Sequence, residues 1–172
     1  MSTVVKAIVA VCDDWGIGLD GDMVVANRED MRHFVSCTMG APVIMGRKTL
    51  FSFPGHKPLK GRRNIVLTRD PEFSAEGVEV AHSMNEALRL VSDADEAWVI
   101  GGGEVYRQFL PVCSECVVTK NHTIRTCDAY FPDLDVDDEW RLERQGETRV
   151  IADGRGDDDV AFDFCTYVRV AE

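Results

Sequence analysis

Apolar runs typical of buried strands alternate along most of this chain with segments that have helical spacing. The stretch Val4 to Val11 is continuous, apolar and rich in β-branched residues, which predicts a buried central strand. Shorter apolar runs predict further strands at 42–45, 64–68, 78–81 and 97–100.

Helical patterns separate these strands. Residues 27–38 place Met31, Phe34 and Val35 on one face, and Ser83 followed by Glu86 forms a capping box ahead of a helix at 87–92. Two more helices are predicted, one from Gly46 to about Phe53 and one over 104–110. This alternation predicts an α/β fold with a mostly parallel, twisted central sheet and flanking helices.

After Pro111 the pattern changes to strands alone. These are predicted at 115–122, 141–151 and 160–170. A turn at 153–156 and an acidic run at 157–159 join the last two, so we expect a C-terminal antiparallel hairpin at the sheet edge. Near the other end, the glycines within 13–22 predict a flexible loop.

Length and charge narrow the class of protein. A chain of 172 residues fits a single domain over 1–172. No apolar run approaches the ~20 residues that span a bilayer, which predicts a cytoplasmic protein without a membrane partner. A net charge of −11 argues against nucleic acid as a binding partner, because its phosphates need a basic face on the protein.

Cys113 and Cys116 lack the second ligand pair that zinc sites require, so we expect no metal.

The segment 99–106 runs from an apolar strand through Gly101, Gly102 and Gly103 into a helix. Glycines allow close approach of a ligand to the main chain, and a helix start presents free N–H groups to an anion. The segment therefore predicts a phosphate-binding turn. The alternative is a tight turn without a ligand.

Two other junctions carry positive charge. Gly46, Arg47, Lys48 and Thr49 follow a predicted strand and open a helix, and the pair 68–69, Thr-Arg, follows the next strand. Together with the glycine turn they suggest a ligand with a pyrophosphate and a further phosphate, as in NADPH. The alternative for each group is a solvated surface charge.

Asp30 decides whether catalysis is expected. It lies at the edge of the apolar face formed by Met31 and Phe34, where desolvation would raise its pKa. The alternative is structural, because Asn27 suits a helix N-cap and Asp30, three residues on, can complete that cap. Arg62 or Arg63 can bind a substrate carboxylate, and the alternative for them is an exposed turn.

Taken in order, these residues resemble the dihydrofolate reductase family over nearly the whole chain. The resemblance rests on Ile17-Gly18, Met23, Asp30, Phe34 and the segments 42–49, 58–68, 99–106, 108–111 and 128–132. It implies a single-domain dihydrofolate-reductase-like fold acting as a monomer. It also implies reduction of 7,8-dihydrofolate to tetrahydrofolate for one-carbon and thymidylate metabolism, and hence a target of antifolates.

In the implied reaction a hydride passes from NADPH to pterin C6 and a proton reaches N5. The resemblance assigns catalysis to Asp30, Met23 and Thr119, with Thr119 supporting Asp30. The residues it assigns to the substrate are Ile8, Val9, Asp30, Met31, Phe34, Phe53, Leu59, Arg62, Ile100 and Tyr106. Those it assigns to the cofactor are Ala10, Ile17, Gly46, Arg47, Lys48, Thr49, Leu67, Thr68, Arg69, Gly101, Gly102, Gly103, Glu104, Val105, Tyr106 and Gln108.

The chain departs from the family pattern after Met23. Here Val24-Val25 replaces the family's Pro-Trp, whose indole lies beside the catalytic carboxylate and helps to position a water molecule. We therefore expect a different proton path and different packing at this point. Two alternative functions follow: an NADPH-dependent pyrimidine reductase of the riboflavin-synthesis type on the same fold, and a non-catalytic pteridine-binding protein.

Overall fold

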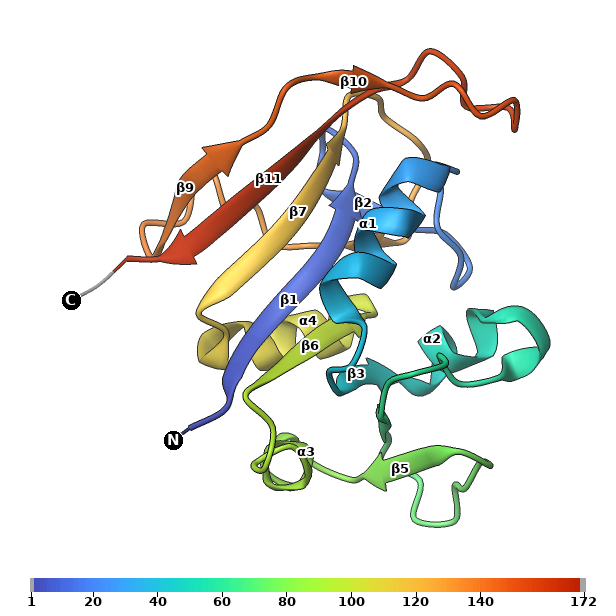
Figure 1. The fold of residues 1–172 in the computed structure, drawn as a ribbon, viewed down its shortest axis with the longest axis vertical. Coiled ribbons are helices and arrows are strands. Elements are labelled where there is room, and N and C mark those ends of the chain that lie inside the picture. The colour runs from blue at the N-terminus through green and yellow to red at the C-terminus, as the bar shows by residue number, and fades with distance from the viewer. Residues whose placement is uncertain (1, 171–172) are drawn as a thin grey trace. The chain divides into compact units, whose positions relative to one another are not determined.

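The computed structural model describes residues 2–170, which divide into two compact units. The first unit comprises 2–7 and 38–113, and the second comprises 8–37 and 114–170. The strand β1 (Val4–Val11) contributes its beginning to the first unit and its end to the second (Figure 1).

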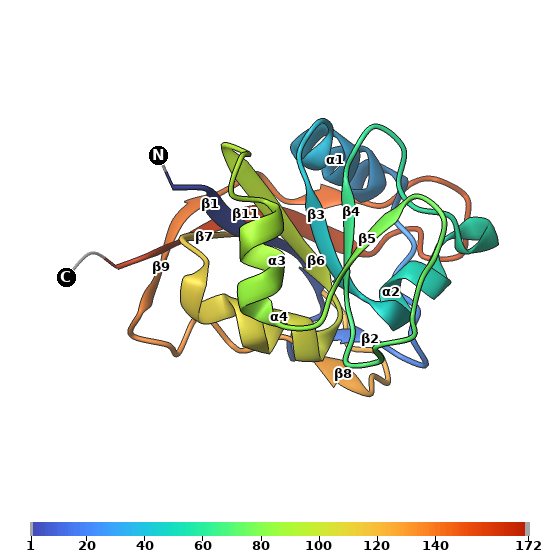
Figure 2. The same ribbon diagram turned by 90° about the horizontal axis from the view of Figure 1, so that it is seen from below.

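The first unit is built on parallel strands. Their order is β1, β6 (Glu96–Gly101), β3 (Val43–Gly46), β4 (Asn64–Leu67) and β5 (Val78–Ala81). The middle strands β3, β4 and β6 are buried and rich in valine and isoleucine, as parallel strands usually are. The helices of this unit are α2 (Arg47–Ser52), α3 (Met84–Leu90) and α4 (Gly103–Phe109), with 3-10 turns η1 (Pro54–His56) and η2 (Leu110–Val112) (Figure 2).

The second unit is antiparallel at its C-terminal strands. β11 (Ala161–Arg169) pairs on one side with β7 (Glu115–Asn121) and on the other with β9 (Trp140–Gln145) and β10 (Arg149–Val150). A separate small sheet pairs β2 (Gly16–Gly18) with β8 (Ala129–Tyr130). Helix α1 (Arg28–Thr38) belongs to this unit except for its last residue.

The predicted fold class is confirmed: the strands of the first unit pair in parallel, and β7, β9, β10 and β11 form antiparallel pairs. The bounds of β1 and β5 agree with the prediction, and Ser83 caps α3 by accepting a hydrogen bond from the Glu86 N–H at 3.1 Å. The helix it caps begins at Met84, earlier than expected.

Two strand predictions need correction. The strand predicted over 141–151 is divided into β9 and β10, because the ladder ends at Gly146, whose N–H bonds the Phe164 carbonyl, and glycine weakens a strand. The loop predicted over 13–22 contains β2, which has three residues and is too short to produce a recognisable alternation. Among residues 2–170, no helix combines the length and the apolar character needed to cross a bilayer.

Candidate active site

Asp30 is a buried carboxylate in the first turn of α1. Its side chain is 8% exposed, and its Oδ1 accepts a hydrogen bond from Thr119 Oγ1 on β7 at 2.6 Å. Burial raises the pKa of Asp30 to about 6, although the Thr119 hydroxyl, which stabilises the charged form, works in the opposite direction. The carboxyl can therefore hold or release a proton close to neutral pH.

The helix cap expected near Asp30 is made by its neighbour. Asn27 Oδ1 accepts a hydrogen bond from the Asp30 N–H at 3.2 Å, so Asn27 is the N-cap of α1. The Asp30 carboxylate is bonded to Thr119 instead of completing the cap. The expected N-cap is therefore present, and the Asp30 side chain is not part of it.

The predicted site residues of the second unit differ in how far they are exposed. Met31, the next residue of α1, is 46% exposed, and Met23 is 55% exposed. Ile8 and Val9, the predicted substrate residues on β1, are both buried.

Three strands of the first unit bring the predicted cofactor residues to one sheet edge. Gly46 at the end of β3 pairs with Leu67 at the end of β4, and Met45 pairs with Gly101 at the end of β6. Because these strands are parallel, the residues that follow them emerge at the same edge, where ligands of open α/β sheets usually bind. The three charged or glycine-rich junctions predicted separately therefore lie together.

The two glycine junctions also lie close to each other. Gly101 has φ +132°, and a Cβ there would lie 3.3 Å from Thr49 Oγ1. A Cβ on Gly46 would lie 3.2 Å from Val105 Cγ2. Helices α2 and α4 begin after Gly46 and Gly102, and neither cap residue supplies a side-chain hydrogen bond. Their first N–H groups can therefore bind an anion.

Basic side chains flank these junctions. Arg47 forms an ion pair with Asp70 at 3.3 Å, and the Asp70 N–H bonds Thr68 Oγ1 at 3.2 Å, so the 68–70 turn is tied to the start of α2. Three other predicted cofactor residues, Lys48, Arg69 and Glu104, are exposed. Of these, Glu104 pairs with Arg107 at 3.3 Å on α4, and Gln108 follows on the same helix.

The first unit also carries the remaining predicted substrate residues. Ile100 on β6 and Tyr106 on α4 are buried, whereas Phe53 and Leu59 are half-buried. The two candidate arginines are clearly distinguished. Arg63 pairs with Glu79 at 2.9 Å and Asp93 at 3.1 Å, while Arg62 bonds Thr38 Oγ1 and the Lys60 carbonyl.

No carboxylate within residues 2–170 forms an ion pair with Arg62, so its charge is available to a substrate carboxylate. Among the same residues, no group of three or more His, Cys, Asp or Glu is placed to hold a metal ion. Cys113 and Cys116 are both buried.

The sequence of this chain matches a known protein family over nearly its whole length. The family model described as dihydrofolate reductase matches residues 4–169. The chain belongs to the dihydrofolate reductase family. It is 42% identical to the dihydrofolate reductase of Mycobacterium leprae, over 84% of this chain and 93% of that one. It is also 41% identical to dihydrofolate reductase type 3 of Salmonella typhimurium, over 75% and 78% of the two chains.

A solved structure agrees with this family membership. The structure described as dihydrofolate reductase from Enterococcus faecalis complexed with NADP(H) and RAB-propyl has a TM-score of 0.87 against this chain and 28% sequence identity. The match covers 99% of this chain and 100% of that one. The similarity thus extends through both units.

Val25 belongs to the segment in which the sequence departs from the expected family pattern. It is 5% exposed and packs in an apolar cluster with Cys12, Ile151 and Phe162, which Val24, Val160 and Phe164 extend. The Val25 side chain is therefore packed within the second unit against Cys12 and against residues 151–164 near the C-terminal end.

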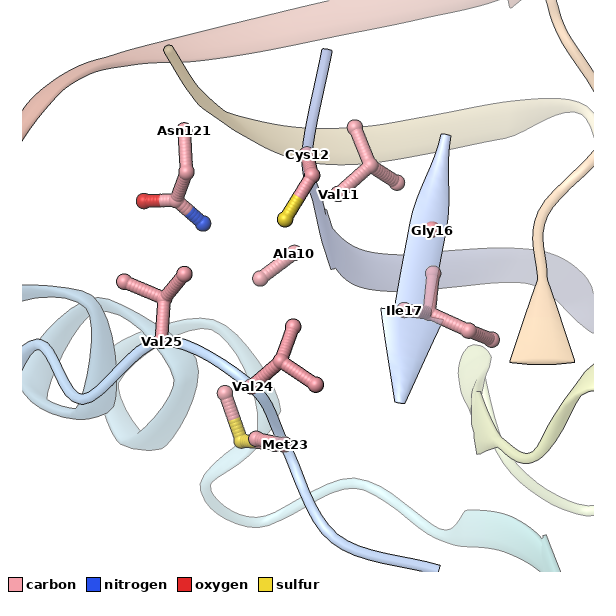
Figure 3. Close-up of a pocket in the computed structure, with 9 residues that line it drawn as sticks. All are labelled: Ala10, Val11, Cys12, Gly16, Ile17, Met23, Val24, Val25 and Asn121. Atoms are coloured by element: carbon pink, nitrogen blue, oxygen red, sulfur yellow. The ribbon is translucent and has the colours of Figure 1, made fainter. Parts of the chain in front are cut away.

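A small cavity lies beside this cluster (Figure 3). It has a volume of about 10 Å³, roughly enough for one water molecule. Ala10 and Ile17, predicted to contact the cofactor, line it together with Met23, Val25 and Asn121.

Asn121 is not among the residues that the sequence predicts for the site. Its amide is directed toward the Cys12 sulfur and Val25 (Figure 3), and its Oδ1 is buried without a partner among the described residues. It lies two positions after Thr119 on β7, so the period of a strand places both side chains on one face. That period is the signal in the sequence that could have identified it.

Proposed function

We propose that this chain reduces 7,8-dihydrofolate to 5,6,7,8-tetrahydrofolate with NADPH. The observation that carries the proposal is the buried Asp30 carboxyl, bonded to Thr119 and with its pKa raised to about 6, in a chain of the dihydrofolate reductase family. A pterin accepts a proton at N5 during this reduction. A carboxyl that titrates near neutral pH suits that requirement.

The second unit contributes binding and proton chemistry in this proposal. Asp30 hydrogen-bonds the pterin ring and favours protonation of N5, and Thr119 orients Asp30 through their 2.6 Å hydrogen bond. Met31 and Phe34 contact the pterin and aminobenzoyl groups. Ile8 and Val9 complete this side of the binding surface, with Met23 in the loop that closes over the reaction.

The first unit contributes phosphate binding. The sheet edge formed by Gly46, Gly101 and Gly102 suits a pyrophosphate for two reasons. The absence of a Cβ at Gly101 leaves space next to Thr49 that a side chain would fill. Helices α2 and α4 also begin there with N–H groups that no side chain caps. Arg69 and Thr68 suit the adenosine 2′-phosphate that distinguishes NADPH from NADH. NADPH supplies the hydride when it is bound.

Arg62 is the proposed clamp for the glutamate carboxylate of the substrate. Its guanidinium has hydroxyl and carbonyl partners but no carboxylate partner among residues 2–170, in contrast with Arg63. Phe53, Leu59, Ile100 and Tyr106 are proposed to contact the substrate from the first unit.

We further propose that residues 1–172 work as one domain, as a monomer in the cytoplasm, without a nucleic-acid partner. The match of the family model to 4–169 and the share of β1 in both units support the single domain. The net charge of −11 supports the absence of nucleic acid binding. Sedimentation equilibrium with and without ligands tests the oligomeric state.

The direct test is the initial rate of NADPH oxidation with dihydrofolate, run in parallel with NADH across pH 5 to 9. We expect a rate that depends on dihydrofolate, is larger with NADPH, and falls as the pH rises through about 6 and Asp30 loses its proton. An enzyme that binds NADPH without oxidising it in the presence of dihydrofolate would contradict the proposal.

A further inference from the structure

Two cysteines of the second unit lie at the base of residues 13–23, which we call the 13–23 segment. Cys12 directly follows β1, and Cys127 comes two positions before β8. Cys12 is buried, Cys127 is half-buried, and both are free thiols. The strand β2 belongs to the 13–23 segment and pairs with β8. The two thiols therefore lie where this segment leaves β1 and where it meets the approach to β8.

Backbone hydrogen bonds hold the two cysteine-bearing stretches of chain together. The residue after the first cysteine, Asp13, donates its N–H to the Thr123 carbonyl at 2.9 Å. The residue after the second cysteine, Asp128, donates its N–H to the Gly18 carbonyl at 2.9 Å. The backbone on both sides of the thiol pair is thus fixed by contacts that do not involve the sulfur atoms.

Gly16 connects the two cysteines. Its carbonyl accepts a hydrogen bond from the Cys12 N–H at 2.9 Å, and a Cβ on Gly16 would lie 2.6 Å from Cys127 Sγ. The Cys127 sulfur therefore packs against the bare backbone of the glycine, and the Cys12 thiol provides it with a hydrogen bond. The small cavity that Cys12 and Gly16 line gives the Cys12 side chain space in which to rotate (Figure 3). Such proximity is what a disulfide requires.

We propose that Cys12 and Cys127 form a reversible disulfide that restrains the 13–23 segment. The oxidant is a small-molecule disulfide such as oxidised glutathione. The more accessible Cys127, as the thiolate, attacks one sulfur of this disulfide and releases the first thiolate, which leaves a mixed disulfide on Cys127. Cys12 then loses its proton to water, attacks Cys127 Sγ and releases the second thiolate. Two cysteine thiols are oxidised, and one external disulfide is reduced to two thiols.

The groups around the pair determine how fast this exchange proceeds. Burial raises the pKa of both thiols, Asp14 raises both further, and Asp128 adds to the effect at Cys127. The N–H groups of Arg125 and Gly18 bond the two sulfur atoms and work in the opposite direction. Because the thiolate is the reactive form, the exchange is slow at neutral pH and becomes faster as the pH rises.

The restraint acts on residues next to the small cavity. The 13–23 segment carries Ile17 and Met23, which line that cavity together with Cys12 (Figure 3). A bond between Cys12 and Cys127 ties the start of the segment to the approach to β8, which limits the closing movement proposed for it. The effect on turnover rests on the proposed function, whereas formation of the disulfide does not.

The test is incubation of the protein with oxidised glutathione at pH 8, followed by mass spectrometry of the intact chain and of its peptides. We expect the intact mass to fall by two hydrogens. The peptides that contain Cys12 and Cys127 should be linked until dithiothreitol is added. The linkage should form about tenfold faster at pH 8 than at pH 7, since the thiolate fraction rises by that factor per pH unit below the pKa.

Matched variants distinguish the two thiols. Cys127→Ser should prevent the linkage, and Cys12→Ala should stop the reaction at a glutathione adduct on Cys127. Cys37→Ser changes another half-buried cysteine and should leave the linkage unaffected. Cys127→Ser keeps the buried Cys12 side chain in its apolar cluster, so it provides the test even if Cys12→Ala does not fold.

Turnover provides the second readout. In the linked protein, the rate of NADPH oxidation with dihydrofolate should fall at least about fivefold and recover with dithiothreitol. Cys127→Ser should keep its rate under the same treatment. A chain that shows no turnover when fully reduced would contradict the proposed function, and the mass measurements would still decide whether the disulfide forms.

Three results would overturn the proposal. The first is a glutathione adduct on the unchanged protein without the loss of two hydrogens. The second is a linkage between other cysteines, such as Cys113 and Cys116. The third is a linked protein with the turnover of the reduced one, which would show that the disulfide does not restrain the 13–23 segment.

Discussion

In the first unit, the groups proposed to meet a ligand are backbone N–H groups and exposed cations at the ends of parallel strands, whereas in the second unit the deciding group is a buried carboxylate. The first set follows from short local patterns, such as Gly46 to Thr49, because the register of β3, β4 and β6 brings their ends together. The second depends on a contact between Asp30 and Thr119, which are 89 residues apart.

We therefore expect the first unit to determine how strongly the cofactor binds and the second unit to provide the proton chemistry. Exposed cations and helix N–H groups change little in charge state near neutral pH, so they fix how strongly a phosphate is held. A buried carboxyl with a raised pKa changes charge over the working range. Substitutions in the first unit should therefore alter affinity for NADPH, and substitutions around Asp30 should alter turnover and its pH dependence.

The largest effect is expected from Asp30→Asn. The amide cannot supply or accept the proton, so kcat at pH 7 should fall by about 10² to 10⁴-fold while the Kd for NADPH changes less than about twofold. Stopped-flow turnover and NADPH fluorescence titration measure the two quantities. Asp138→Asn, an exposed carboxylate of the same unit, serves as the control with full activity. Full turnover in Asp30→Asn would remove the proposed distinction between the units.

Arg69→Ala tests the first unit in the complementary way. We expect the preference for NADPH over NADH, measured as a ratio of kcat/KM values, to fall by about 10 to 100-fold, because a charge-assisted contact to the 2′-phosphate is lost. The pH profile with saturating NADPH should stay as in the unchanged protein. Arg89→Ala, an exposed arginine on α3, is the matched control. An unchanged preference would move 2′-phosphate recognition to other residues.

Gly101→Ala tests the shape of the glycine junction. Gly101 has φ +132°, and an added Cβ would lie 3.3 Å from Thr49 Oγ1, so we expect a loss of about 1–3 kcal/mol in stability and weaker NADPH binding. Gly154→Ala also places alanine at positive φ but meets nothing within 4 Å, so it should lose less stability and keep NADPH affinity. Urea unfolding and NADPH titration compare the two. Equal behaviour would show that backbone strain alone accounts for the change.

Thr119→Val should produce the smallest but most specific effect. The Thr119 hydrogen bond lowers the pKa of Asp30, so its removal raises that pKa further, by about one unit for a hydrogen bond of ordinary strength. The fall in kcat with rising pH should therefore move to higher pH, and Thr119→Ser should restore the original profile. A lower rate with an unmoved profile would mean that Thr119 only supports packing.

Local patterns in the sequence predicted a large part of this fold. A continuous apolar run defines β1, and a capping box places Ser83 at the start of α3, because both depend on neighbours along the chain. The short strands β2 and β8 were missed since three and two residues carry no measurable alternation. The division of the strand predicted over 141–151 also depends on pairing with β11, which the sequence does not show.

The candidate site was less predictable from local sequence than the fold. Spacing alone could not decide whether Asp30 completes the cap formed by Asn27 or provides a carboxylate for chemistry, because the same i to i+3 separation is compatible with both roles. The resemblance to the family provided Thr119 as the partner of Asp30. The strand period could have placed Asn121 on the face of Thr119, but not beside Cys12 and Val25, because those residues are distant from it in the sequence.

The state of Asp30 is the central claim, and a 13C NMR titration of its side-chain carboxyl measures it directly, with Asp30→Asn to assign the signal. The account predicts a midpoint near pH 6, well above the ordinary aspartate value of 3.8, because burial penalises the charged form more than Thr119 stabilises it. A midpoint at or below 3.8 would contradict the account, since the carboxyl would then be fully ionised throughout the range in which the proton is needed.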